Sequence, residues 1–265
     1  MNRINQLFNI KRDNILSIYF CAGDPYAGHT ANMLQVLASR GVDMVEIGIP
    51  FSDPMADGPV IQDAATRALR HGMTLRKLFS ELRDVRTRVD IPLILMGYLN
   101  PILQYGFERF CQDCRQCGID GVIIPDLPFR EYMDHFRSTA EACNLKIIML
   151  ITPETEPHRI REIDAHTDGF IYLVSSAATT GAQTGFGNEQ QAYFRRIAAM
   201  QLHNPCLIGF GISNRQTYEA ASEHAAGCII GSRFVSLLKE YDGHVTEAID
   251  RLLADIGRTL QSSQS

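Results

Sequence analysis

Eight short apolar segments, separated by stretches with helical periodicity, constrain the fold of this 265-residue chain most strongly. Each segment is about four to eight residues long, rich in Ile, Val or aromatic residues, and bounded by Gly, Pro or Asp. These properties are typical of β-strands. The segments cover residues 15–22, 43–49, 92–98, 121–126, 146–151, 169–174, 205–210 and 227–231.

The stretches between the apolar segments predict helices, for example over 30–41, 74–86, 130–143 and 189–200. Gly41 stands where a helix is followed by its C′ glycine, and Thr74 stands at an N-cap position. Strands that alternate with helices indicate a parallel sheet with helical crossovers. The count of eight favours a closed (β/α)8 barrel, and no Gly-x-Gly-x-x-Gly follows the first strand as a dinucleotide-binding fold would require.

We therefore expect an α/β protein with one TIM-barrel domain over residues 1–265, in which 261–265 form a disordered polar tail. An extra helix should precede the first strand, and a short phosphate-binding helix should follow the eighth.

The composition is that of an ordinary globular protein, with 45% hydrophobic and 21% charged residues. The net charge of −5 and a pI near 5.9 give no basic footprint for nucleic acid. No apolar run approaches the roughly 20 residues of a membrane span, and the N-terminal segment is too polar for a signal peptide. These features predict a cytoplasmic protein that binds neither nucleic acid nor membrane.

Seven cysteines are present, and we interpret them as reduced thiols. Cys111, Cys114 and Cys117 have a spacing that is compatible with a metal or iron–sulfur site. A fourth ligand at iron–sulfur spacing is missing and no histidine lies among them. A helix with three thiols on one partly buried face is the simpler interpretation, and we expect no metal.

Glu46 is a lone charge in the second predicted strand. Side chains alternate along a strand, so Val45, Ile47 and Ile49 share one face and Glu46 lies on the other. If the apolar set faces the surrounding helices, Glu46 points into the barrel, near the end where barrel active sites are built. Burial would raise the pKa of this carboxyl and suit it to general acid–base catalysis. The alternative is a buried ion pair with an arginine.

A proline-rich loop, PFSDPMADGP (50–59), follows this strand and carries two aspartates. Three prolines stiffen the loop and so position its side chains. Asp57 is the better candidate for contact with a substrate, although an Asp-Gly turn is the alternative. Asp53 is more typical of a residue that caps the turn locally.

Glycine-rich loops follow the last three predicted strands. The seventh strand leads into Gly209-Phe210-Gly211, the eighth into Gly231-Ser232, and the sixth into SSAATTGAQTGFG (175–187). Backbone NH groups at such loops and at a helix N-terminus bind phosphate in many barrels. The sequence therefore predicts a phosphate site at Gly211, Gly231 and Ser232. Gly181 supplies a third loop contact, in a segment with the composition of a lid.

Several segments together resemble the tryptophan synthase alpha chain family. The most specific is EIGIPFSDPMADGP (46–59), and the likeness extends from about residue 1 to 260. The other matching segments, in the family's order, are AGDP (22–25), MGYLNPI (96–102), PDLPFRE (125–131), TTGAQ (179–183), GFGIS (209–213) and IIGS (229–232).

The resemblance implies a (β/α)8 lyase that cleaves indole-3-glycerol phosphate to indole and glyceraldehyde 3-phosphate by a reverse aldol reaction. It implies Glu46 as the general acid/base and Asp57 as the acceptor of a hydrogen bond from the indole NH. Tyr172 should line the site, and Tyr19 and Phe210 should flank the indole, with core packing as the alternative for these three residues. Thr180 should contact Asp57 when the lid closes. The resemblance also implies phosphate contacts at Gly181, Gly211, Gly231 and Ser232.

The same resemblance implies a beta-chain partner in a heterotetramer of two alpha and two beta chains. Pyridoxal phosphate belongs to the beta chain, so no cofactor is expected on this chain. The apolar stretch 96–106 is our candidate for part of the interface. Two features depart from the family pattern: the lid sequence around Ser176 to Thr179, and Arg233, which either contacts the phosphate or points to solvent.

Two rival functions are distinguishable by chemistry. A Schiff-base aldolase needs a lysine at the C-terminal end of a strand, whereas Lys146 begins the fifth predicted strand. A non-catalytic subunit that only activates a partner would not need Glu46 and Asp57, and both are present.

Overall fold

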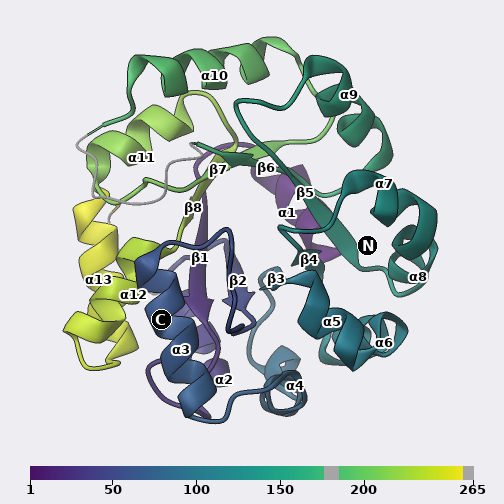
Figure 1. The fold of residues 1–265 in the computed structure, drawn as a ribbon. Helices are drawn as coiled ribbons and strands as arrows, with labels where there is room; N and C mark the ends of the chain where they lie inside the picture. Colours follow the sequence, from purple (N-terminus) through teal and green to yellow (C-terminus); the bar gives the residue numbers. More distant parts are fainter. Residues whose placement is uncertain (176–184, 259–265) are drawn as a thin grey trace.

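The computed structural model describes residues 1–175 and 185–258, and its strands close into a parallel barrel in the order β1-β2-β3-β4-β5-β6-β7-β8 (Figure 1). The first strand pairs with the last, with Ile15 opposite Gly227. The strands are β1 (Ile15–Cys21), β2 (Met44–Gly48), β3 (Leu93–Met96), β4 (Gly121–Ile123), β5 (Lys146–Ile151), β6 (Ile171–Val174), β7 (Cys206–Gly209) and β8 (Gly227–Ile230). The predicted (β/α)8 barrel is confirmed.

Most predicted strands extend beyond the observed ones by one to three residues. The apolar pattern continues past the last ladder hydrogen bond because the residues that follow still line the core. Ile49, after β2, is 7% exposed, and Ile124, after β4, is 3% exposed. Burial and strand pairing end at different residues, and sequence patterns report only burial.

The helices of the described residues surround the barrel on its outer face, except the first, which lies across one end of it (Figure 1). They are α1 (Arg3–Ile10), α2 (Thr30–Ser39), α3 (Pro59–Arg70), α4 (Leu75–Leu82), α5 (Leu99–Tyr105), α6 (Phe107–Cys117), α7 (Phe129–Glu131), α8 (Arg137–Ala142), α9 (Pro157–His166), α10 (Asn188–Ala199), α11 (Arg215–Ser222), α12 (Ser232–Glu240) and α13 (Val245–Asp255). A 3₁₀ turn, η1 (Val85–Thr87), follows α4, and a π-helical turn, η2 (Tyr132–Phe136), joins α7 to α8.

The predicted helix ends agree with the structure at two positions. Thr74 caps α4, because its hydroxyl accepts a hydrogen bond from the backbone NH of Lys77 at 3.2 Å. Gly41 follows the C-cap residue of α2 with a φ of +76°, the left-handed conformation that glycine adopts without strain.

The three clustered cysteines lie on one buried face of α6, as the helical interpretation predicted. Burial raises the pKa of Cys111 to about 12 and that of Cys117 to about 11, so both thiols stay protonated. Within residues 1–175 and 185–258, no group of three or more His, Cys, Asp or Glu side chains is arranged to hold a metal ion. These thiols pack as small apolar groups.

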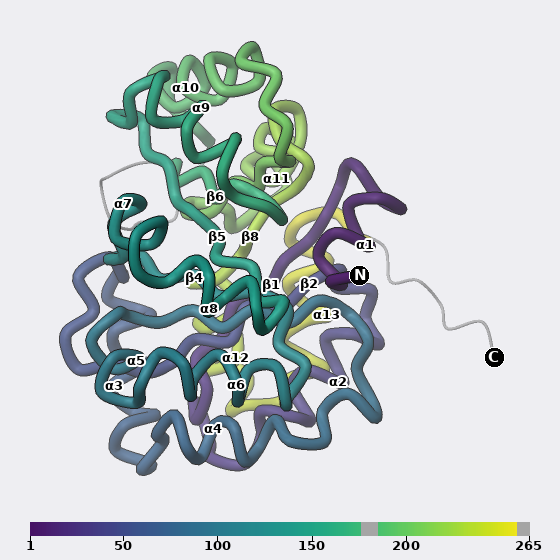
Figure 2. Tube along the Cα trace, turned by 90° about the vertical axis from the view of Figure 1, so that its right-hand side faces the viewer, coloured from purple at the N-terminus to yellow at the C-terminus, as the bar shows by residue number. Residues whose placement is uncertain are grey.

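The N-terminal helix α1 covers the end of the barrel where the strands begin, on the right-hand side in Figure 2. Asn2 caps α1 and donates to the backbone carbonyls of Asp120 and Asn144, which precede β4 and β5. Ile4 is fully buried, and a Cβ added to Gly121 would contact it. The extra N-terminal helix is therefore a cap on the barrel, and the opposite end is left for the loops that follow the strands.

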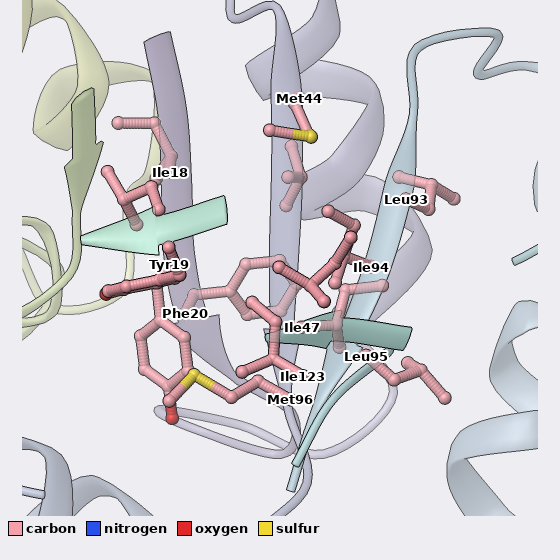
Figure 3. Packing of buried hydrophobic residues seen from close by; sticks show 14 of the residues in the cluster. Ile18, Tyr19, Phe20, Met44, Ile47, Leu93, Ile94, Leu95, Met96 and Ile123 are labelled. Atoms are coloured by element: carbon pink, nitrogen blue, oxygen red, sulfur yellow. The ribbon is translucent and has the colours of Figure 1, made fainter. Parts of the chain in front are cut away.

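The wall of the barrel is largely apolar. Figure 3 shows buried side chains of β1, β2, β3 and β4, with Tyr19 among them. No helix in the described part of the chain is long and apolar enough to cross a bilayer.

Candidate active site

Glu46 lies inside the barrel, as strand parity predicted. It pairs with Tyr19 on β1 and Ile94 on β3, and its side chain is fully buried. Its Oε1 accepts a hydrogen bond from the Ser17 hydroxyl at 3.0 Å, whereas Oε2 has no partner among the described residues. No described arginine or lysine pairs with this carboxyl, so the structure argues against the buried ion pair.

Burial determines the protonation of Glu46. Desolvation penalises the carboxylate and raises the pKa to about 8, although the Ser17 hydrogen bond acts in the opposite direction. A carboxyl with this pKa holds a proton near neutral pH and can also release it, which is the requirement for a group that acts as both acid and base.

Asp57 lies in the loop between β2 and α3, directly before the Gly58 N-cap of α3. Its Oδ2 accepts a hydrogen bond from the Tyr98 hydroxyl at 2.9 Å, and the same hydroxyl accepts from the backbone NH of Ala56 at 2.9 Å. Burial raises the pKa of Asp57, and the Tyr98 hydrogen bond partly offsets that effect. The Asp57 side chain is thus held by a contact from another loop, which a simple Asp-Gly turn would not require.

Tyr98 is a site residue that the sequence did not reveal. It lies just after β3, is 4% exposed, and ties the following segment to the Asp57 loop. The segment MGYLNPI contains it, but the residue pattern gives no indication that a tyrosine there reaches an aspartate 41 residues earlier.

A second support for this loop comes from the first βα connection. Asp24 is buried and makes two hydrogen bonds to the Arg67 guanidinium on α3, at 2.7 and 3.0 Å. Such bidentate pairs fix geometry as well as charge. The Asp24–Arg67 pair therefore holds α3, which begins two residues after Asp57, against the end of β1.

Asp53 does not reach the interior. It is exposed, and its carboxylate accepts a hydrogen bond from the neighbouring Ser52 hydroxyl. This local contact agrees with the prediction that Asp53 serves the turn.

Tyr19 and Tyr172 bring two phenols toward the carboxylates from β1 and β6. Both are buried, and glycines make room for them: a Cβ on Gly48 would collide with the Tyr19 hydroxyl, and one on Gly209 with the Tyr172 hydroxyl. Burial raises the pKa of each phenol well above its usual value, and both Glu46 and Asp57 add to the effect. The two tyrosines and the two carboxylates therefore share one interior space.

Phe210 follows β7 with a φ of +72°, a conformation that non-glycine residues rarely adopt. The Ser175 hydroxyl donates to its carbonyl at 2.9 Å, and its ring meets that of Tyr172 edge-on with centroids 6.2 Å apart. Gly211 comes next, and a Cβ there would contact Ser175 and Phe186. The β7 loop is thus folded back toward Tyr172, as expected for an aromatic residue that flanks the site.

The loop after β8 leads directly into α12, whose N-cap is Gly231 and whose first residue is Ser232. Gly231 lies beside Tyr19, because a Cβ on it would be 3.3 Å from that ring. The predicted short helix after the eighth strand is confirmed, and its N-terminal NH groups lie at the same end of the barrel as Glu46.

Arg233 does not match either predicted alternative. Its Nη2 pairs with Oδ2 of Asp255 on α13 at 2.7 Å, and a second contact at 4.0 Å reaches Glu240. The guanidinium therefore joins α12 to α13. Thr180 and Gly181, the remaining predicted site residues, lie outside the described residues.

Comparisons with known proteins point to one family. The family model for the tryptophan synthase alpha chain matches residues 6–263. The tryptophan synthase alpha chain of Phocaeicola vulgatus is 66% identical over 253 residues, which are 96% of this chain and 98% of the relative. The corresponding chain of Bacteroides thetaiotaomicron is 65% identical over 240 residues, or 91% of this chain and 94% of the relative.

Solved structures extend the likeness to the fold. Tryptophan synthase subunit alpha of Legionella pneumophila superposes with a TM-score of 0.86 at 35% identity and covers 97% of each chain. A chain from the tryptophan synthase complex of Pyrococcus furiosus superposes with a TM-score of 0.83 at 32% identity, over 93% of this chain and 98% of that one. The barrel, the buried glutamate, the braced aspartate and these matches along nearly the whole length lead to one conclusion: this chain belongs to the tryptophan synthase alpha chain family.

Proposed function

We propose that Glu46 and Asp57 carry out the reaction of this lyase family, the cleavage of indole-3-glycerol phosphate to indole and glyceraldehyde 3-phosphate in tryptophan biosynthesis. The observation that carries the proposal is that a fully buried glutamate, whose pKa is about 8, and a half-buried carboxylate of the next loop both act on the phenols of Tyr19 and Tyr172. A reverse aldol reaction needs one group that both gives and takes a proton and another that stabilises positive charge.

The proton transfers balance, because Glu46 gives one proton and takes one back. Protonated Glu46 delivers its proton to C3 of the indole ring, and the ring nitrogen becomes positive. Asp57, held by Tyr98, accepts the hydrogen bond of the indole NH and stabilises that charge, and its partial burial strengthens the interaction. The glutamate, now ionised, removes the proton of the adjacent glycerol hydroxyl. The carbon–carbon bond then breaks, its electrons return to the ring, and glyceraldehyde 3-phosphate leaves with a new carbonyl group.

The rest of the site binds the substrate. The rings of Tyr19, Tyr172 and Phe210 suit the flat indole. The N-terminus of α12, at Gly231 and Ser232, together with the loop at Gly211, suits the phosphate, because backbone NH groups and the helix dipole favour an anion there. Thr180 and Gly181 complete the proposed set by family likeness.

A beta-chain partner is implied by the family, and we propose an assembly of two alpha and two beta chains in which the beta chain carries pyridoxal phosphate. The segment 96–106 supports an interface only in part, because Tyr98 and Ile102 are buried while Leu103 is 46% exposed. Met55, in the Asp57 loop, is 86% exposed and offers a second apolar contact at the same end of the barrel.

The test is indole release by the purified chain, with and without a beta chain. Replacing Glu46 by Gln keeps the shape and removes the transferable proton, so we expect kcat to fall roughly 10²–10⁴-fold. Glu131→Gln, at a glutamate whose side chain is 53% exposed, is the matched control and should keep full activity. Full activity in Glu46→Gln would reject the assigned role, and no release by the folded parent chain under either condition would reject the enzyme.

A further inference from the structure

The two oxygens of the Glu46 carboxyl have different surroundings, and this difference bears on which oxygen exchanges a proton with the substrate. Oε1 accepts from Ser17, a fully buried residue on β1, and Oε2 is buried with no partner among the described residues. Ser17 pairs with Met44, two residues before the Tyr19–Glu46 pair. The hydroxyl therefore reaches Oε1 from the side of the barrel where the strands begin.

A serine hydroxyl carries one proton, and when it is buried that proton needs an acceptor. Within residues 1–175 and 185–258, the acceptor that the structure gives Ser17 is Oε1 of Glu46. If the Glu46 proton sat on Oε1, it would compete with the Ser17 proton for the same short contact. The arrangement that satisfies both groups places the Glu46 proton on Oε2 and leaves Oε1 as an acceptor in both protonation states.

We propose that Ser17 is a positioning residue that occupies Oε1 and so makes Oε2 the atom through which Glu46 gives and takes protons. The proposal rests on the acid–base role assigned to Glu46 above and adds to it the identity of the reacting oxygen. It also gives a reason for a hydroxyl in an otherwise apolar strand, ILSIYFC, where every residue is buried.

Other titratable groups face Glu46 from the neighbouring elements. They are Tyr19 on β1 and Tyr172 on β6, and the charge of Asp57, in the loop after β2, also acts on both phenols. Burial holds the pKa of both phenols well above the usual value, so they stay neutral while Glu46 titrates. Asp57 is a second carboxyl, and its signal must be separated from that of Glu46 by assignment.

Infrared spectroscopy of the full chain without substrate can make that assignment. The carbonyl stretch of the protonated Glu46 is the band present in the parent and missing in Glu46→Gln. In Ser17→Ala the carbonyl oxygen loses its donor, so we expect this band at higher frequency. We also expect its titration midpoint to rise by on the order of one pH unit, because a hydrogen bond to the charged form is lost. Ser17→Thr keeps a hydroxyl and should restore both values.

Kinetics provide the second measurement. A general acid must be protonated, so kcat/KM should fall as the pH rises through the Glu46 pKa. In Ser17→Ala this alkaline limb should shift to higher pH, together with the infrared midpoint. Cys228→Ala is the matched control, since it also removes one buried heteroatom from the barrel wall. The Cys228 thiol faces Tyr218 and Ser222 on α11, so the band and the limb should stay unchanged.

The outcomes separate the two hypotheses. An unchanged band and midpoint in folded Ser17→Ala would overturn the role of Ser17 and leave Glu46 as the acid–base group. The infrared measurement needs no turnover, so it tests the Ser17 contact independently of catalysis. Retained activity of Glu46→Gln, in contrast, would reject the proposed function itself.

Discussion

At the scale of single residues, the burial of Glu46 raises the pKa of its carboxyl and lowers the free energy of unfolding at neutral pH. The pKa is 4.5 for an ordinary glutamate and about 8 in this fold, so the folded state binds the proton more tightly than the unfolded chain does. Below about pH 4.5 the carboxyl is neutral in both states and there is no penalty. As the pH rises from there to about 8, the unfolded chain ionises freely while the folded chain resists, so the free energy of unfolding decreases.

Glu46→Gln should therefore be more stable than the parent, and the advantage should depend on pH. The difference in free energy of unfolding should be small at pH 5, grow through pH 7 and level off above pH 8 at a few kcal/mol. Urea unfolding of both proteins at a series of pH values measures it. Glu131→Gln, on the surface, should show no such dependence; a constant difference across the series would argue against a raised pKa.

Strand parity was sufficient to place Glu46 from the sequence, because an apolar strand with one charge has a single satisfactory orientation. Its partner Ser17 was not predictable in the same way. The Ser17–Glu46 contact depends on the register between β1 and β2, which pairs Ser17 with Met44, and register is not encoded in either strand alone. The partner of Arg233 was not predictable either, because Asp255 lies on a different helix.

At the scale of elements, the Asp57 loop is fixed by its neighbours as well as by its own prolines. The Tyr98 hydroxyl bridges the backbone of Ala56 and the carboxylate of Asp57, and it does so from the connection between β3 and α5. The stiffness of the loop was predictable from Pro50, Pro54 and Pro59. The bridge was not, because it joins two connections that meet only in the closed barrel.

Tyr98→Phe should weaken catalysis with little change in fold. Loss of a hydrogen bond to a charged group is worth about 1.5–3 kcal/mol, so we expect kcat/KM to fall by roughly ten- to a hundredfold. The pKa of Asp57 should also rise, which moves the acidic limb of the rate profile upward. Steady-state kinetics between pH 5 and 9 test both effects.

Tyr105→Phe is the matched control for this variant. Tyr105 ends α5, and its hydroxyl donates to Asp113 on α6 at 2.5 Å, away from the Asp57 loop. It should leave the rate profile unchanged. Equal losses in the two variants would point to a general effect of removing a hydroxyl near α5.

At the scale of the whole molecule, the two ends of the barrel have different tasks. The carboxylates and aromatic rings gather where the strands end, and the opposite end is closed by α1 and a network around Asp120. That aspartate is 4% exposed and accepts from the Arg86 guanidinium at 2.5 Å and from the backbone NH of Leu93 at 3.0 Å. The alternation and count of strands predicted this division, because barrels build their active sites at one end only. The predicted single-domain organisation stays a prediction, and the tail at 261–265 lies outside the described residues.

Asp120→Ala should destabilise the protein without changing its chemistry. It removes the carboxylate partner of the partly buried Arg86, which keeps its hydrogen bonds to backbone carbonyls, and it leaves the backbone NH of Leu93 without its acceptor. We expect a cost of roughly 2–5 kcal/mol. Activity per folded molecule should equal that of the parent. Asp90→Ala is the control, because Arg3 forms ion pairs with both Asp120 and Asp90 but Asp90 is 97% exposed. Its loss should cost at most about 1 kcal/mol. Urea unfolding and indole release measured on the same samples separate stability from rate.

The pairing of β1 with β8 also has a consequence for synthesis of the chain. On the ribosome, Ile15–Cys21 is made before the other strands of the barrel, but the strand that covers its free edge, Gly227–Ile230, is made after all of them. Until β8 is made, one edge of β1 has no partner strand in the barrel, and an unpaired apolar edge is the kind of surface on which misassembly begins. Slow elongation just before β8 would prolong this exposure, so the timing of translation, and not only the finished contacts, bears on how much active protein a cell obtains.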